Sequence, residues 1–97
     1  MRTTIQPSHN TTSIAGIYPN PFNSTTMLEL NLAHSGYVQV TIVNVLGREV
    51  SRPVASWHQR GTQRLMIDAD YLPAGIYFVR VVTGDGFSQV RKILLLP

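Results

Sequence analysis

Three histidines and two closely spaced aspartates are the residues of this chain best suited to binding a metal. His9, His34 and His58 lie far apart, and none stands two or four residues from another common metal ligand. Asp68 and Asp70 share one side of an extended segment. Calcium, however, takes about six to eight oxygen ligands, and no dense acidic loop surrounds this pair. We therefore expect the aspartates to shape a turn by bonding nearby N–H groups, and we predict no metal and no cofactor.

The chain also lacks the sequence patterns of common catalytic sites. It contains no G-x-S-x-G nucleophile motif and no glycine-rich phosphate loop. Apart from Asp68, Asp70 and Asp85, the acidic side chains of the chain are Glu29 and Glu49. Their positions in the sequence give no reason to expect either glutamate beside Asp68 or Asp70, so we do not predict the pair of carboxylates that a glycosidase uses. The short run from Gly84 to Gly86 is typical of a tight hairpin turn. We predict that the chain is not an enzyme.

Aromatic rings leave one binding alternative open, because exposed rings can stack on sugars. Trp57 stands at the end of a strand-like run and Tyr71 lies in a turn-like segment. Most of the other aromatic residues occupy positions where packing in a core is the default. A carbohydrate-binding module that uses Trp57 and Tyr71 is therefore an alternative function.

Length, charge and cysteine content narrow the class of protein. The 97 residues make about one domain. Eight Lys and Arg against five Asp and Glu give a net charge of +3, but the basic residues are scattered, which argues against nucleic-acid binding. The apolar run at residues 93–96 is far shorter than the roughly 20 residues that a membrane-spanning helix needs. The absence of cysteine excludes a disulfide scaffold and a thiolate zinc site.

Hydrophobic residues alternate with polar ones along most of the chain, which is typical of strands with one face toward a core. Turn-forming Gly, Pro, Asn and Ser separate these runs. We expect about seven strands, at residues 14–18, 26–32, 37–44, 49–56, 63–68, 76–83 and 88–96. Their number and spacing predict an immunoglobulin-like antiparallel β-sandwich. Residues 1–13 are polar and are predicted to form a linker or arm, and residues 14–97 the domain.

Four segments follow one another in a characteristic order. They are Tyr18, Pro19, Asn20, Pro21, Phe22 and Asn23; the turn around Gly47; the block that contains Asp68, Leu72, Gly75 and Tyr77; and the end of the chain, where Arg91 and Lys92 precede an apolar run. Over about residues 14–96, this set resembles the type A C-terminal sorting domains of the type IX (Por) secretion system. The family often ends on a basic residue, whereas this chain ends on Pro97.

The resemblance implies a function that the residues alone do not. Domains of this family direct an attached cargo protein of Bacteroidota to an outer-membrane translocon, and a sortase-like protease usually removes them. It implies passage through the periplasm to the cell surface or medium. The alternative to this function, besides carbohydrate binding, is a structural or adhesive immunoglobulin-like module, such as the similar domain of flagellar hook-capping proteins.

The end of the chain is the segment that we expect the translocon to recognise. The candidate recognition residues are Val90, Arg91, Lys92, Ile93, Leu94, Leu95 and Leu96. Arg91 and Lys92 are expected to meet acidic receptor groups, and residues 93–96 to offer a sheet edge to which another strand can add. Tyr77 is expected in the core, with a hydrogen-bond partner for its hydroxyl group.

Overall fold

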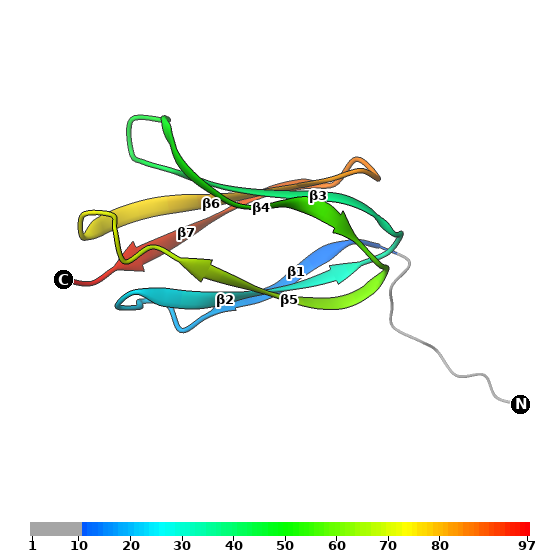
Figure 1. Ribbon diagram of the computed structural model, residues 1–97, viewed down its shortest axis with the longest axis horizontal. Coiled ribbons are helices and arrows are strands. Elements are labelled where there is room, and N and C mark those ends of the chain that lie inside the picture. The colour runs from blue at the N-terminus through cyan, green and yellow to red at the C-terminus, as the bar shows by residue number, and fades with distance from the viewer. Residues whose placement is uncertain (1–10) are drawn as a thin grey trace, which may run out of the picture.

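The computed structural model describes residues 11–97 as two antiparallel sheets packed face to face (Figure 1). The strands are β1 (Ser13–Tyr18), β2 (Thr25–Leu32), β3 (Gly36–Val43), β4 (Glu49–His58), β5 (Gly61–Asp68), β6 (Gly75–Thr83) and β7 (Ser88–Leu95). One sheet has the strand order β1-β2-β5 and the other β4-β3-β6-β7. The predicted all-β sandwich of about seven strands is confirmed. Residues 11–97 contain no helix of the length and apolarity that a membrane span requires.

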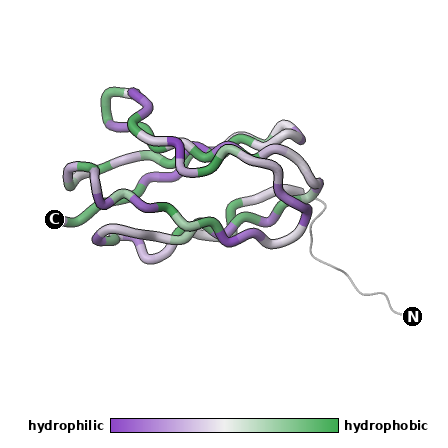
Figure 2. The backbone as a smooth tube through the Cα atoms, in the orientation of Figure 1, coloured by the Kyte–Doolittle hydropathy of each residue, from purple (hydrophilic) through white to green (hydrophobic). Residues whose placement is uncertain are grey.

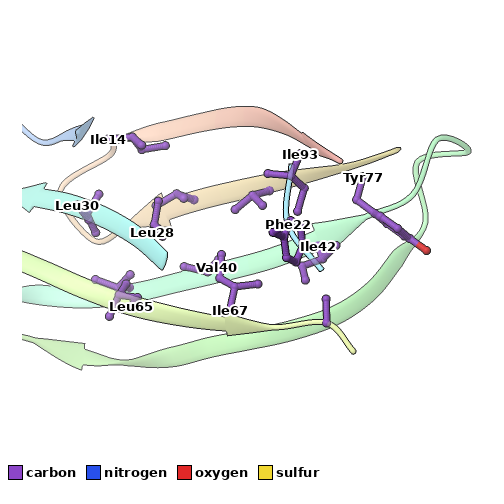
Figure 3. Close-up of a cluster of buried hydrophobic side chains, with 14 of the residues drawn as sticks. Ile14, Phe22, Leu28, Leu30, Val40, Ile42, Leu65, Ile67, Tyr77 and Ile93 are labelled. Carbon is purple, nitrogen blue, oxygen red and sulfur yellow. The ribbon is translucent and has the colours of Figure 1, made fainter. Parts of the chain in front are cut away.

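The period of two in the sequence places the core between the two sheets (Figure 3). In β2, Leu28, Leu30 and Leu32 are fully buried, whereas Glu29 and Asn31 between them are only partly buried. Val40 of β3 pairs in register with Val81 of β6, and both side chains are completely buried. The interior is therefore a layer of aliphatic side chains drawn from both sheets.

Thr12 anchors the start of the described chain to the sandwich. Of the predicted arm, residues 1–10 lie outside the described residues, Thr12 is buried and Ser13 begins β1. The Thr12 hydroxyl group donates to Asp85 Oδ2 at 2.6 Å and accepts from the Ala33 N–H at 2.9 Å. The chain therefore enters the sandwich beside the β2–β3 and β6–β7 turns.

Asp85 lies in the β6–β7 hairpin turn and accepts hydrogen bonds from several groups. Thr12, Thr83 and the Phe87 N–H donate to its carboxylate. The bond from Thr12 and, after it, that from Thr83 lower the pKa of Asp85 from 3.8 to about 2. Because the pKa is lower in the folded chain, this stabilisation is complete above about pH 4 and is lost as the pH falls toward 2.

We expect the Asp85→Asn variant to lose part of the pH dependence of folding. Between pH 4 and pH 2, its free energy of unfolding should fall less steeply than that of the wild type, because the variant has no carboxylate to protonate at this position. Urea unfolding at several pH values in this window measures both slopes. Equal slopes would show that Asp85 is not the group responsible.

Tyr77 of β6 is buried in the core but keeps its hydroxyl group paired, as predicted. It is 7% exposed, and its hydroxyl group donates to the Pro73 carbonyl oxygen at 2.6 Å. A tyrosine near the start of the sixth strand that bonds back to the preceding corner is a recurring device of immunoglobulin-like sandwiches. The bond holds the connection between β5 and β6 against the core.

The Tyr77→Phe variant should therefore fold, with a free energy of unfolding lower by about 1 kcal/mol. It keeps the buried ring and loses only the bond to Pro73, for which a typical net contribution is about 0.5–1.5 kcal/mol. Chemical denaturation of the two proteins gives the difference. A variant as stable as the wild type would mean that this bond contributes nothing.

Candidate recognition site

The segments that resemble the sorting-domain motifs gather at one end of the sandwich. β1 ends there at Tyr18, β5 ends at Asp68, β6 begins at Gly75 and β7 ends at Leu95. The C-terminus lies at this end in Figure 1, and the first described residues enter at the opposite end. Residues far apart in the sequence thus form one compact region.

Asn20 and Phe22 hold the free edge of β7. The Asn20 side chain donates to the Lys92 carbonyl oxygen and accepts from the Leu94 N–H, both at 3.0 Å. Phe22 then donates its N–H to the Leu94 carbonyl oxygen at 3.0 Å and accepts from the Leu96 N–H at 2.8 Å. Phe22 and Leu95 thus form a parallel β-bridge. The Asn20 side-chain amide extends this pairing along β7, because it bonds the backbone of Lys92 and Leu94. We call residues 18–22 the edge clamp.

The edge clamp corrects one expectation from the sequence. Residues 93–96 were expected to offer an open edge for strand addition, but Asn20 and Phe22 already bond the outward backbone groups of Leu94 and Leu96. The two X-Pro bonds of the clamp, at Pro19 and Pro21, are cis. Tyr18 still belongs to β1 and pairs with Met27. As the fixed ring of proline suggests, residues 19–22 join no regular ladder and pair with β7 only through the single bridge at Phe22.

The side chains of β7 and the residue after it divide between two faces. Ile93 and Leu95 are buried in the core. Arg91, on the same face, is partly buried and donates to the Ile14 carbonyl oxygen at 3.3 Å, so it does not project toward a receptor as expected. Among the candidate recognition residues 90–96, the four outward side chains, all exposed, are Val90, Lys92, Leu94 and Leu96. Only these four present a candidate recognition surface to solvent.

The outward side of β7 continues across the four-stranded sheet. Arg80 stands opposite Val90, Phe78 opposite Lys92 and Ile76 opposite Leu94. Farther along, Tyr37 of β3 stands opposite Trp57 of β4. We call this surface the outer sheet face; its exposed apolar and aromatic side chains are Tyr37, Trp57, Ile76, Val82, Val90, Leu94 and Leu96. This face was not predicted from the sequence; the signal that could have indicated it is that β6 carries apolar residues on both sides, which is unusual for an antiparallel strand with one exposed side.

The turn between β3 and β4 is a second exposed apolar feature. Val45 and Leu46 in this turn are 67% and 77% exposed. Figure 2 shows that the protruding turn contains a hydrophobic stretch. The Asn44 side chain accepts hydrogen bonds from the N–H groups of Leu46 and Arg48, both at 3.0 Å. Gly47 has a φ of 82°, which an L residue rarely adopts. The motif glycine therefore fixes a rigid turn that displays two hydrophobic side chains.

The block from Asp68 to Gly75 closes the same end of the molecule. The Asp68 carboxylate accepts from the Asp70 N–H at 3.2 Å, which confirms the turn-shaping role expected for Asp68. Leu72 packs against the core and Gly75 adopts a φ of 150°. In residues 11–97, no cluster of three or more His, Cys, Asp or Glu side chains is placed to hold a metal.

Among residues 11–97, neither the histidines nor the two candidate sugar-binding rings come together in one site. His9 lies outside the described residues, His34 lies in the β2–β3 turn, and His58 is the last residue of β4. Trp57 is 67% exposed and Tyr71 61% exposed. Tyr71 bonds the Ser51 hydroxyl group. Ser51 and Trp57 are six positions apart on β4, about 20 Å at strand spacing, so the two rings do not build one platform.

Comparisons with known proteins agree with this geometry. A family model described as a secretion system C-terminal sorting domain matches residues 16–95. A solved structure of CopC from Methylosinus trichosporium OB3b is similar in fold, with a TM-score of 0.55 and 18% identity over 88% of this chain and 91% of that one. No curated protein matches the chain. Because the family model spans nearly all of the sandwich, the chain belongs to the family of C-terminal sorting domains of type IX secretion.

Proposed function

We propose that this domain directs a covalently attached cargo protein through the type IX secretion system. It carries no reaction of its own. The cargo passes from the periplasm to the cell surface or the medium, the outer-membrane translocon is the receptor, and a sortase-like protease removes the domain. The observation that supports this proposal most is the family match over residues 16–95. The position of the motifs, at the end of the sandwich opposite to the first described residues, suits a domain that faces its receptor away from a cargo.

Within the domain, the exposed side of β7 is the part that we propose the translocon reads. Val90, Leu94 and Leu96 supply apolar contacts and Lys92 supplies the charge. Ile93, Leu95 and Arg91 serve the fold and hold this side in place. Recognition is thus assigned to a folded surface, in which the edge clamp and β7 act as one unit.

The test is to fuse all 97 residues to the C-terminus of a periplasmic reporter enzyme. The reporter is then measured outside the cell in a bacterium with a type IX system and in the same strain without its translocon. We expect the reporter outside only in the first strain. A reporter that stays in the periplasm of both strains would favour a structural or adhesive module, and this proposal would then be wrong.

A further inference from the structure

We propose that the docking surface of this domain is the whole outer sheet face, and that it binds an acidic protein surface of the secretion machinery. This inference rests on the proposed function and deepens it, because it adds β3, β4 and β6 to the segment that the sequence suggested. It also states the chemistry of the partner. Three independent features of the described residues support it.

The first feature is the kind of side chain on this face. Trp57 and Tyr37 stand opposite each other in register and are 67% and 49% exposed. Arg80 is exposed in the middle of the sheet. Trp, Tyr and Arg are the residue types that contribute most often to the binding energy of protein interfaces. Exposed aromatic rings held on a rigid sheet also lose little conformational freedom on binding.

The second feature is the distribution of charge between the two sheets. The exposed charged residues on the strands of the four-stranded sheet are Arg52, Arg80 and Lys92 against one acidic residue, Glu49. Arg91 does not contribute, because it lies on the inward face of β7. Arg52 binds Glu49 through two hydrogen bonds, at 2.9 and 3.0 Å. The strands of the three-stranded sheet carry Arg64 against Glu29 and Asp68. The outer sheet face is therefore positive on a molecule whose opposite sheet is not, which selects an acidic partner.

The third feature is size and shape. Four strands about 4.8 Å apart and about eight residues long span roughly 500 Å². This area includes polar as well as apolar side chains, and it lies below the roughly 800 Å² per partner of a stable complex. The β3–β4 turn rises above this face at one end (Figure 1) and brings Val45 and Leu46 into reach of the same partner. A weak, transient protein contact suits a signal that must be read and released.

The experiment uses the reporter fusion with two variants of the outer sheet face. One is Arg80→Glu, and the other combines Trp57→Ser with Tyr37→Ser. Their controls are Arg60→Glu, which reverses an exposed charge in the β4–β5 turn, and Met66→Ser on the opposite sheet, where Met66 is 58% exposed. We expect each face variant to lower the exported fraction at least about tenfold and each control to change it less than about twofold. Thermal melting of the purified domains shows whether each variant folds.

A competition experiment tests whether the outer sheet face binds a shared receptor that excess domain can saturate. The 97-residue chain, overproduced without cargo in the periplasm, should reduce export of the wild-type reporter, and the Arg80→Glu chain should fail to compete. If the wild-type reporter is exported but folded Arg80→Glu and Trp57→Ser/Tyr37→Ser fusions are exported equally well, this inference is wrong and the proposed function stands. Failure of the wild-type reporter itself overturns both.

If the outer sheet face bound a lipid surface or a sugar, these experiments would give results different from those expected for a protein partner. Binding of the purified chain to phosphatidylglycerol vesicles, lost in Arg80→Glu, together with no competition between domains would assign the face to lipid. Retention on insoluble polysaccharide, lost in the Trp57→Ser variant while export is unchanged, would assign it to sugar. Either result overturns the proposed protein partner.

Discussion

Replacing Phe22 by alanine should lower the free energy of unfolding by about 3–5 kcal/mol, the usual cost of removing a buried phenylalanine ring. Phe22 is 2% exposed and packs within the core cluster, although it lies in a loop between β1 and β2 (Figure 3). Its backbone also bonds Leu94 and Leu96. Loss of the ring therefore leaves a cavity and loosens the edge clamp at the same time. For a domain of this size, we expect the melting temperature to fall by roughly 15–30 °C.

Thermal and urea unfolding of the purified domain measure this effect. The Phe22→Leu variant is the control, because it keeps most of the apolar volume and the backbone bonds. It should lose clearly less stability than the alanine variant. A Phe22→Ala domain that melts within a few degrees of the wild type would show that the edge clamp is not part of the folded core.

Replacing Val90 and Leu94 together by aspartate should reduce export of the reporter at least about tenfold without unfolding the domain. Both side chains point outward from β7, and they are 52% and 37% exposed. Under the proposed function, each substitution removes an apolar contact with the translocon, and a total loss of about 1.4 kcal/mol in binding is tenfold in affinity. The added negative charge also repels an acidic receptor.

Met66→Asp, on the exposed side of the other sheet, is the matched control and should be exported normally. The melting temperature of both variants should stay within a few degrees of the wild type, since exposed positions tolerate such changes. Normal export of the Val90→Asp/Leu94→Asp fusion would contradict the assignment of recognition to β7.

Deletion of residues 90–97 does not separate recognition from folding. The deletion removes Ile93 and Leu95 from the core, which are 1% and 3% exposed, together with most of an edge strand. It also leaves the edge clamp without its partner. Because an unfolded domain loses every surface at once, substitutions on the outward side of β7 are the informative ones.

The fold could be predicted from the sequence because strands and turns depend on neighbouring residues, through the alternation of hydrophobic and polar side chains and through turn-forming residues. Leu28, Leu30 and Leu32 alternate with polar residues, and a slip of one position would expose all three. The same pattern placed Tyr77 in the core, and the preceding Pro73 lies close enough to accept its bond. In each case, the information needed lies within a few residues.

The edge clamp and the division of β7 depended on long-range packing and could not be predicted this way. Asn20 and Leu94 are 74 positions apart, and nothing in either segment indicates that an amide side chain will complete a strand edge. In residues 93–96, every side chain is apolar, so alternation does not reveal which ones face inward. The inward direction of Arg91 follows from its bond to Ile14, which only the packed sandwich provides.

The central claim is that the translocon reads the exposed side of β7 on a folded domain. Its most direct test places a photo-reactive amino acid at position 94 or at position 66 of the exported fusion and irradiates living cells that carry the type IX system. The account predicts a covalent adduct with a translocon component from position 94 and none from position 66. Adducts formed equally from both positions, or none from position 94 in a fusion that is exported, would contradict it.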